Sequence, residues 1–202
     1  MLAKNVKGIL LFAGESKRMG KLKPLLPIGE ETVVETVLNE YRASSLSEVV
    51  LVLGYRADDI KRIIDRKINS NKLKVVVNKG FKKEMFSSIQ TGIVEIKDAE
   101  GILIGLGDQV LITCDIINEL TENYIKDKVL IPTFQGRKGH PVIIPYTMRN
   151  EILAMDAEKT TLKDVLGRHR DVINFLEMKS DRVLIDMDTK EEYERIKAIW
   201  KK

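Results

Sequence analysis

Short apolar runs alternate along this chain with segments in which apolar residues recur every three or four positions. The runs predict buried strands, and they cover residues 7–13, 48–53, 73–77, 101–107, 129–134, 172–177 and 183–185. The periodic segments predict amphipathic helices, and they cover residues 32–42, 57–68, 86–96, 115–124, 148–154, 162–168 and 190–200. Residues 141–145 predict a further strand, antiparallel and near a sheet edge, because a proline stands at each end.

This alternation predicts an α/β fold: a mostly parallel, Rossmann-like sheet with helices on both faces and one antiparallel strand. Residues 101–107 are apolar throughout and predict a central strand buried on both faces. No repeat, low-complexity tract or Gly/Ser-rich linker interrupts the sequence, so we expect residues 1–202 to form a single domain. Ligands of such sheets bind beyond the carboxyl ends of the strands.

Composition narrows the classes of partner. The net charge of +4 comes from interspersed charges of both signs, whereas nucleic-acid binding favours a concentrated basic face with stacking aromatic groups. No segment reaches the roughly 18 consecutive apolar residues of a membrane span, and the first residues do not resemble a secretion signal. The single cysteine fits a reducing compartment. We therefore expect a cytoplasmic protein that binds a small polyanion, with no nucleic acid and no membrane partner.

The loop after the first predicted strand is the most informative segment. Gly14 and Gly20 bracket it, and it carries Ser16 and Arg18. Small residues let the backbone approach a ligand, backbone N–H groups can point at phosphate oxygens, and cations neutralise them. The spacing excludes a Walker A motif and a dinucleotide-binding fingerprint. The loop therefore predicts an anion-binding site at the end of a buried strand.

The order of residues here, Ala-Gly-x-Ser-x-Arg-Met-Gly followed by Lys-x-Leu-Leu-Pro, resembles the signature of nucleotidyltransferases that activate small phosphorylated acceptors. Within that superfamily the chain is most similar to the molybdenum cofactor cytidylyltransferases, and less so to the molybdopterin guanylyltransferases. The resemblance continues in residues 78–92, 106–109, 136–145 and 186–189. It implies the fold of nucleotide-diphospho-sugar transferases.

The resemblance also implies an activity: Mg²⁺-dependent transfer of CMP from CTP to the phosphate of molybdopterin, with release of pyrophosphate. Arg18 is expected to reach the β- and γ-phosphates, Lys23 the α-phosphate, and Asp108 the metal ion, which makes these three the catalytic candidates. Transient contact with a molybdoenzyme that receives the product is implied as well. The nucleotide-binding candidates are Ala13, Gly14, Glu15, Ser16, Arg18, Met19, Gly20, Lys23, Asn78, Ser87 and Ser88.

Two aspartates are expected to bind Mg²⁺, which prefers carboxylate oxygen. Asp108 follows the most apolar strand. For the second ligand we choose Asp188, because alternation along a strand would put it on one face with Asp186 and nearer to the ligand edge. Asp186 stays open as the alternative, and an N-cap formed by Thr189 is the structural interpretation of the same segment.

The segment Gly-x-x-Gly-His-Pro-Val at residues 136–142 resembles the border of the family's acceptor pocket. It implies substrate-binding roles for Gly139 and His140.

In the segment 78–92, Ser87 and Ser88 could equally be helix caps, and Glu84 stands where the family usually has glycine.

Departures from the family patterns leave the substrates open. Ala13, where guanylyltransferases carry glycine, and Gln109 favour the cytidylyl branch, whereas residues 157–169 lack a segment common among cytidylyltransferases. GTP as donor, and a sugar phosphate or another phosphorylated metabolite as acceptor, are therefore the alternatives. A non-catalytic carrier of the finished cofactor and a nucleic-acid-binding domain are disfavoured, because Lys23, Asp108 and Asp188 are all present.

Overall fold

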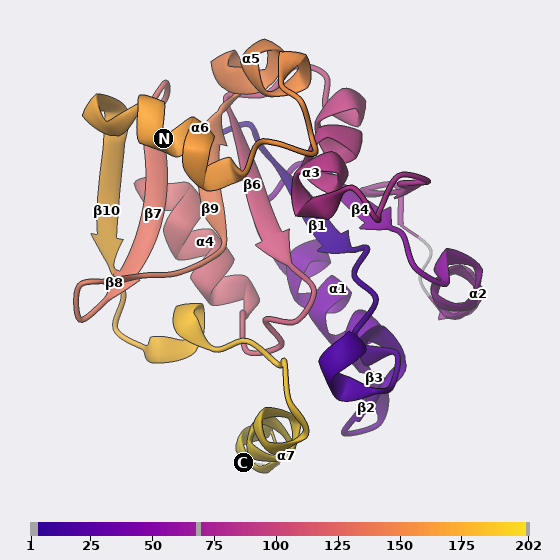
Figure 1. The fold of residues 1–202 in the computed structure, drawn as a ribbon. Coiled ribbons are helices and arrows are strands. Elements are labelled where there is room, and N and C mark those ends of the chain that lie inside the picture. The colour runs from indigo at the N-terminus through magenta and orange to yellow at the C-terminus, as the bar shows by residue number, and fades with distance from the viewer. Residues whose placement is uncertain (1–3, 68–69, 201–202) are drawn as a thin grey trace.

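The computed structural model describes residues 4–67 and 70–200. Its main sheet has the strand order β10-β7-β9-β6-β1-β4-β5, with the short β8 paired to β7 (Figure 1). These strands are β1 (Val6–Phe12), β4 (Val49–Leu53), β5 (Leu73–Val77), β6 (Gly101–Leu106), β7 (Val129–Phe134), β8 (Arg137–Lys138), β9 (Val142–Pro145) and β10 (Ile173–Glu177). A separate hairpin pairs β2 (Pro27–Ile28) with β3 (Glu31–Thr32).

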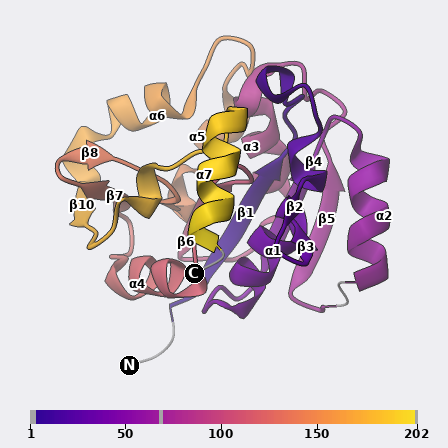
Figure 2. The ribbon, with the colours of Figure 1, turned by 90° about the horizontal axis from the view of Figure 1, so that it is seen from below.

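Helices cover both faces of this sheet (Figure 2). They are α1 (Val33–Ala43), α2 (Ala57–Lys67), α3 (Glu84–Glu95), α4 (Cys114–Asn123), α5 (Arg149–Ala154), α6 (Leu162–Arg168) and α7 (Lys190–Trp200). Position 68, the expected end of α2, lies outside the described residues. In the part of the chain that the structure describes, no helix is both long and apolar enough to cross a bilayer.

Side chains of β1 alternate between two buried apolar clusters, one on each face of the sheet. Leu10 and Phe12 join the cluster that includes α1 and α4, whereas Ile9 and Leu11 join the cluster that includes α3, α5 and α6. Such two-sided burial is why the strand reads as a continuous apolar run. The neighbouring β6 occupies the middle of the sheet and is likewise buried on both faces, as the sequence predicts.

The predicted fold class is confirmed. β1 pairs in parallel with β4 and β6, β4 with β5, and β7 with β10, while β9 runs antiparallel to β6 and β7. The expected edge position of β9 is wrong, because β9 lies between β6 and β7. The prolines stand just before it and at its last residue, so the N–H groups between them remain free for the ladder.

The strand expected at residues 183–185 is also wrong. Residues 181–184 form a short 3₁₀ helix. Its N-cap is Ser180, whose hydroxyl oxygen accepts a hydrogen bond from the Arg182 N–H. Val183 packs directly over Gly139, where a Cβ atom would overlap the Val183 carbonyl oxygen. This tertiary contact outweighs the strand preference of the three apolar residues.

Gly105 in the middle of β6 is required by packing. A Cβ atom at this position would overlap the hydroxyl oxygen of Tyr41, which is fully buried in α1. We expect Gly105→Ala to lower the free energy of unfolding by about 1–3 kcal/mol, measured by chemical denaturation. Gly167→Ala is the control, because nothing lies near a Cβ there and the residue is in α6. Equal stability of the two variants would contradict the close packing of Tyr41.

Candidate active site

Two loops begin side by side at the carboxyl edge of the sheet. β1 and β6 are parallel neighbours in which Leu11 pairs with Leu106, and the Gly107 N–H donates to the Leu11 carbonyl oxygen at 2.9 Å. The loop after β1 and Asp108 after β6 therefore start at the same level. On the other side of β1, the Tyr55 N–H donates to the Ala13 carbonyl oxygen at 3.1 Å.

The loop after β1 is held in shape by its own contacts. Ser16 and Gly20 have positive φ angles of 54° and 62°, so the backbone turns sharply at both. The Lys23 N–H donates to the Ser16 hydroxyl oxygen at 3.2 Å. Met19 is buried in the core and anchors the middle of the loop.

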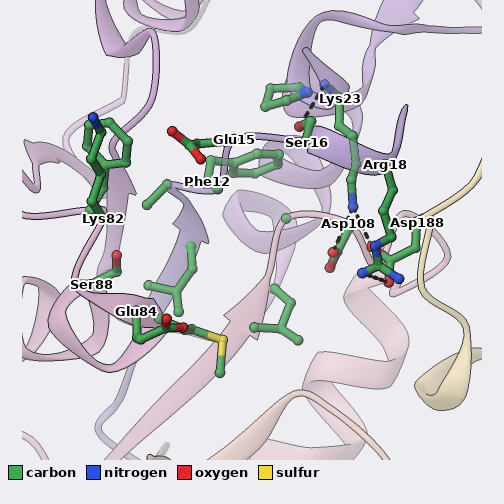
Figure 3. A pocket seen from close by; sticks show the side chains of 18 residues that line it. Phe12, Glu15, Ser16, Arg18, Lys23, Lys82, Glu84, Ser88, Asp108 and Asp188 are labelled. Atoms are coloured by element: carbon green, nitrogen blue, oxygen red, sulfur yellow. Dashed lines mark hydrogen bonds and ion pairs between the residues drawn. The ribbon is translucent and has the colours of Figure 1, made fainter. Parts of the chain in front are cut away.

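Lys23 lies between two carboxylates that are distant in sequence (Figure 3). Its Nζ is 2.7 Å from Asp188 Oδ1 and 3.2 Å from Asp108 Oδ2, and its side chain is only 13 % exposed. Arg18 Nη2 is 2.6 Å from Asp188 Oδ2. Burial would raise the pKa of Asp188, but the hydrogen bonds and charges of Lys23 and Arg18 hold it below the ordinary value. Two carboxylates thus converge on one cation.

Backbone hydrogen bonds fix Asp188 in this place. The Met187 N–H donates to the Asp108 carbonyl oxygen at 2.9 Å, which ties the two aspartate segments together. The N–H groups of Asp188 and Thr189 donate to Glu192 Oε2, and the Glu192 N–H donates to Thr189 Oγ1. This reciprocal pattern is a capping box at the start of α7, so Thr189 is an N-cap as expected.

Asp186 is directed elsewhere. Its Oδ1 accepts from Gln109 Nε2 at 3.0 Å, and its side chain lines a second cavity of about 430 Å³. Burial raises its pKa; the Gln109 hydrogen bond opposes this, and the charges of Asp108 and Asp188 add to it. The strand alternation expected for this segment is wrong, because the residues before Asp188 form a 3₁₀ helix followed by irregular backbone.

A cavity of about 460 Å³ opens beside Lys23, Asp108 and Asp188. Lys82 and Glu84 lie across the cavity from Lys23 (Figure 3). Their sequence neighbours Phe81 and Met85 also line the cavity. None of these four is among the predicted site residues. The sequence feature that pointed to this wall is Glu84, which stands where the family usually has glycine. The predicted residues that line the cavity are Ala13, Gly14, Glu15, Ser16, Arg18, Lys23, Ser88, Asp108 and Asp188.

Asn78 and Ser87 lie behind the cavity wall rather than in it. The Asn78 amide donates to the hydroxyl oxygens of Ser87 at 2.8 Å and Ser88 at 3.0 Å, and all three residues are buried. The alternative that the serines cap a helix is wrong, because Lys83 holds the cap position of α3 and both serines lie inside the helix. The amide instead fixes Ser88, which does line the cavity.

Four other predicted residues are not brought into the cavity: Met19, Gly20, Gly139 and His140. Gly139 and His140 lie under Val183, whose carbonyl oxygen accepts the His140 N–H at 3.0 Å. Burial lowers the pKa of His140, although the nearby charge of Asp108 opposes the shift. Neutral imidazole is therefore favoured at neutral pH.

The donor set can be tested against a divalent cation. Within residues 4–67 and 70–200, no group of three or more His, Cys, Asp or Glu side chains is arranged to hold a metal ion. Mg²⁺ is commonly bound through one or two carboxylates together with substrate phosphates and water. Asp108 and Asp188 fit that pattern, because the Lys23 ammonium between them shows that both face one cation position.

A family model described as the MobA-like NTP transferase domain matches residues 8–172. The chain belongs to this family. The resemblance seen in the sequence is thereby confirmed, and the protein is a nucleotidyltransferase by family.

Two curated relatives match across almost the whole chain. The molybdenum cofactor cytidylyltransferase of Escherichia coli K12 is 23 % identical over 92 % of each chain. The nicotine blue oxidoreductase of Paenarthrobacter nicotinovorans is 25 % identical over 95 % of this chain and 96 % of its own. Among solved structures, a homologue of Mycobacterium tuberculosis Rv0371c from Mycobacterium sp. strain JC1 has a TM-score of 0.81 with 25 % identity and covers 96 % of both chains.

Proposed function

We propose that this protein is a cytoplasmic, Mg²⁺-dependent nucleotidyltransferase that transfers CMP from CTP to the phosphate of molybdopterin. One observation carries the proposal: Lys23, Asp108 and Asp188 converge beside a backbone loop at the carboxyl edge of the sheet. Transfer of a nucleotidyl group needs such an arrangement, because it depends on positioning and charge neutralisation rather than on a protein nucleophile.

In the proposed reaction, an oxygen of the acceptor phosphate forms a bond to the α-phosphorus of CTP. The bond from the α-phosphorus to the bridging oxygen breaks, and pyrophosphate leaves with that electron pair. The attacking phosphate is already ionised at neutral pH, so no general base is required. Lys23 would neutralise charge at the α-phosphate. Arg18, whose side chain is 71 % exposed, would exchange its ion pair with Asp188 for the leaving phosphates.

Asp108 and Asp188 would hold Mg²⁺ together with phosphate oxygens of the substrate. The ion would supply charge neutralisation on the triphosphate.

Two features support CTP over GTP as the donor. Ala13 lines the cavity, and its methyl group narrows the space available to a purine. Gln109 follows Asp108, as in the cytidylyl branch. GTP remains the alternative donor, and a sugar phosphate the alternative acceptor.

The test supplies Mg²⁺, molybdopterin and each nucleoside triphosphate in turn and measures pyrophosphate release. We expect turnover with CTP to exceed turnover with GTP by about 10-fold or more. Turnover that is lost when molybdopterin is omitted would support the acceptor. Equal turnover with a sugar phosphate in its place would overturn the acceptor, and release of no pyrophosphate with any pair would overturn the reaction.

A further inference from the structure

Glu84, the first residue of α3, has an unusual backbone conformation. Its φ is 66°, in the left-handed region that favours glycine and costs other residues about 1 kcal/mol. Neighbouring contacts hold the conformation, because the Ser87 hydroxyl donates to the Glu84 carbonyl oxygen at 2.9 Å and Asn78 fixes Ser87 in turn. A glycine would satisfy this backbone at lower cost, so the side chain itself needs an explanation.

The Glu84 carboxylate faces the cavity from the wall opposite Lys23 (Figure 3). Among the described residues, it has no hydrogen-bonding or ion-pair partner. The adjacent Lys83 is not available to it, because its Nζ pairs with Glu158 at 3.1 Å. Glu84 is exposed at the cavity wall, so its carboxylate is free to accept a hydrogen bond from a ligand in the cavity.

The cavity between these two walls suits a nucleoside. Arg18 and Lys23 draw the triphosphate to one end, so the base extends toward the other. Phe81 and Met85 supply apolar surface there, which suits the flat faces of a base. The polar edge of the base then meets Glu84.

We propose that the Glu84 carboxylate accepts a hydrogen bond from the exocyclic amino group of cytosine and thereby selects CTP over UTP. This inference rests on the proposed function. Cytosine carries an amino donor at C4 that a carboxylate can accept. Uracil carries a carbonyl oxygen at the same position, which would face the carboxylate acceptor to acceptor and leave both groups unpaired.

The test measures CTP and UTP affinities by calorimetry with Mg²⁺ and without an acceptor. We expect the wild type to prefer CTP by about 10-fold or more, and Glu84→Gly to reduce that preference below about 3-fold. Glu84→Gly should also unfold at an equal or higher temperature, because it relieves the positive φ. Lost selectivity with retained or increased stability is an outcome that a merely structural role would not give.

Asp127→Gly is the matched control. Asp127 has a φ of 61° in a turn and does not line the cavity, so its replacement should affect stability in the same direction and leave the CTP preference unchanged. If Glu84→Gly binds CTP and UTP with the wild-type ratio, the inference fails while the proposed function stands. If the wild type binds neither nucleotide, the proposed function fails as well.

Discussion

Replacing Asp108 with alanine is expected to lower the rate of pyrophosphate release by about 10³-fold or more. The variant loses one of the two carboxylates that would hold the metal ion, while Lys23 keeps Asp188 as its partner. The fold should survive, because the Asp108 side chain is 30 % exposed and its carbonyl oxygen still accepts the Met187 N–H. Turnover is measured at saturating nucleotide and Mg²⁺, with thermal unfolding recorded on the same samples.

Asp108→Asn removes the negative charge of the side chain but keeps its shape. Its rate of pyrophosphate release should be nearly as low as that of the alanine variant. Asp115→Asn is the control, because Asp115 is an exposed aspartate in the first turn of α4, away from the cavity. It should retain wild-type turnover. An Asp108→Asn enzyme within about threefold of the wild type would mean that the carboxylate charge has no part in the reaction.

Lys23→Met is expected to change two quantities in opposite directions. Turnover should fall by about 10²- to 10³-fold, because charge at the α-phosphate is no longer neutralised. Binding of Mn²⁺ without nucleotide should tighten by about 10-fold, because the ammonium now 2.7 Å from Asp188 and 3.2 Å from Asp108 no longer competes for the carboxylates. Electron paramagnetic resonance of free Mn²⁺ measures the second change.

Lys21→Met controls for a general loss of positive charge, since Lys21 is an exposed lysine of the same loop outside the cavity. It should leave both Mn²⁺ affinity and turnover near the wild-type values. Unchanged Mn²⁺ affinity in Lys23→Met would show that the metal ion and the ammonium do not share ligands, and the assignment of Asp108 and Asp188 to the metal would fail.

Much of the fold follows from local pattern. Strands β1 and β6 are buried on both faces, so their sequences are continuous apolar runs that predict their positions. The interior place of β9 could not be predicted from its prolines, because they stand at its ends and long-range pairing decides where it inserts. The local pattern of residues 183–185 does not predict their conformation, because Val183 packs against Gly139, which is distant in sequence.

The wall of the cavity that carries Lys23 and Asp108 could be predicted for a similar reason. The loop from Gly14 to Gly20 follows the end of β1, and Lys23 lies just past that loop. Asp108 follows the end of β6. The opposite wall depends on the positive φ of Glu84 and on side-chain contacts of α3. Neither can be predicted from the spacing of apolar residues. The sequence does not predict that the Asp186 side chain points away from Asp188 either, because its direction depends on the hydrogen bond from Gln109.

The matched family region ends at residue 172, yet one of the two converging carboxylates belongs to Asp188. Asp188 is joined to Asp108 through the main chain, because the Met187 N–H donates to the Asp108 carbonyl oxygen. The C-terminal segment therefore completes the cluster around Lys23. A chain that stopped at residue 172 would keep Lys23 and Asp108 but would lack one of the two carboxylates.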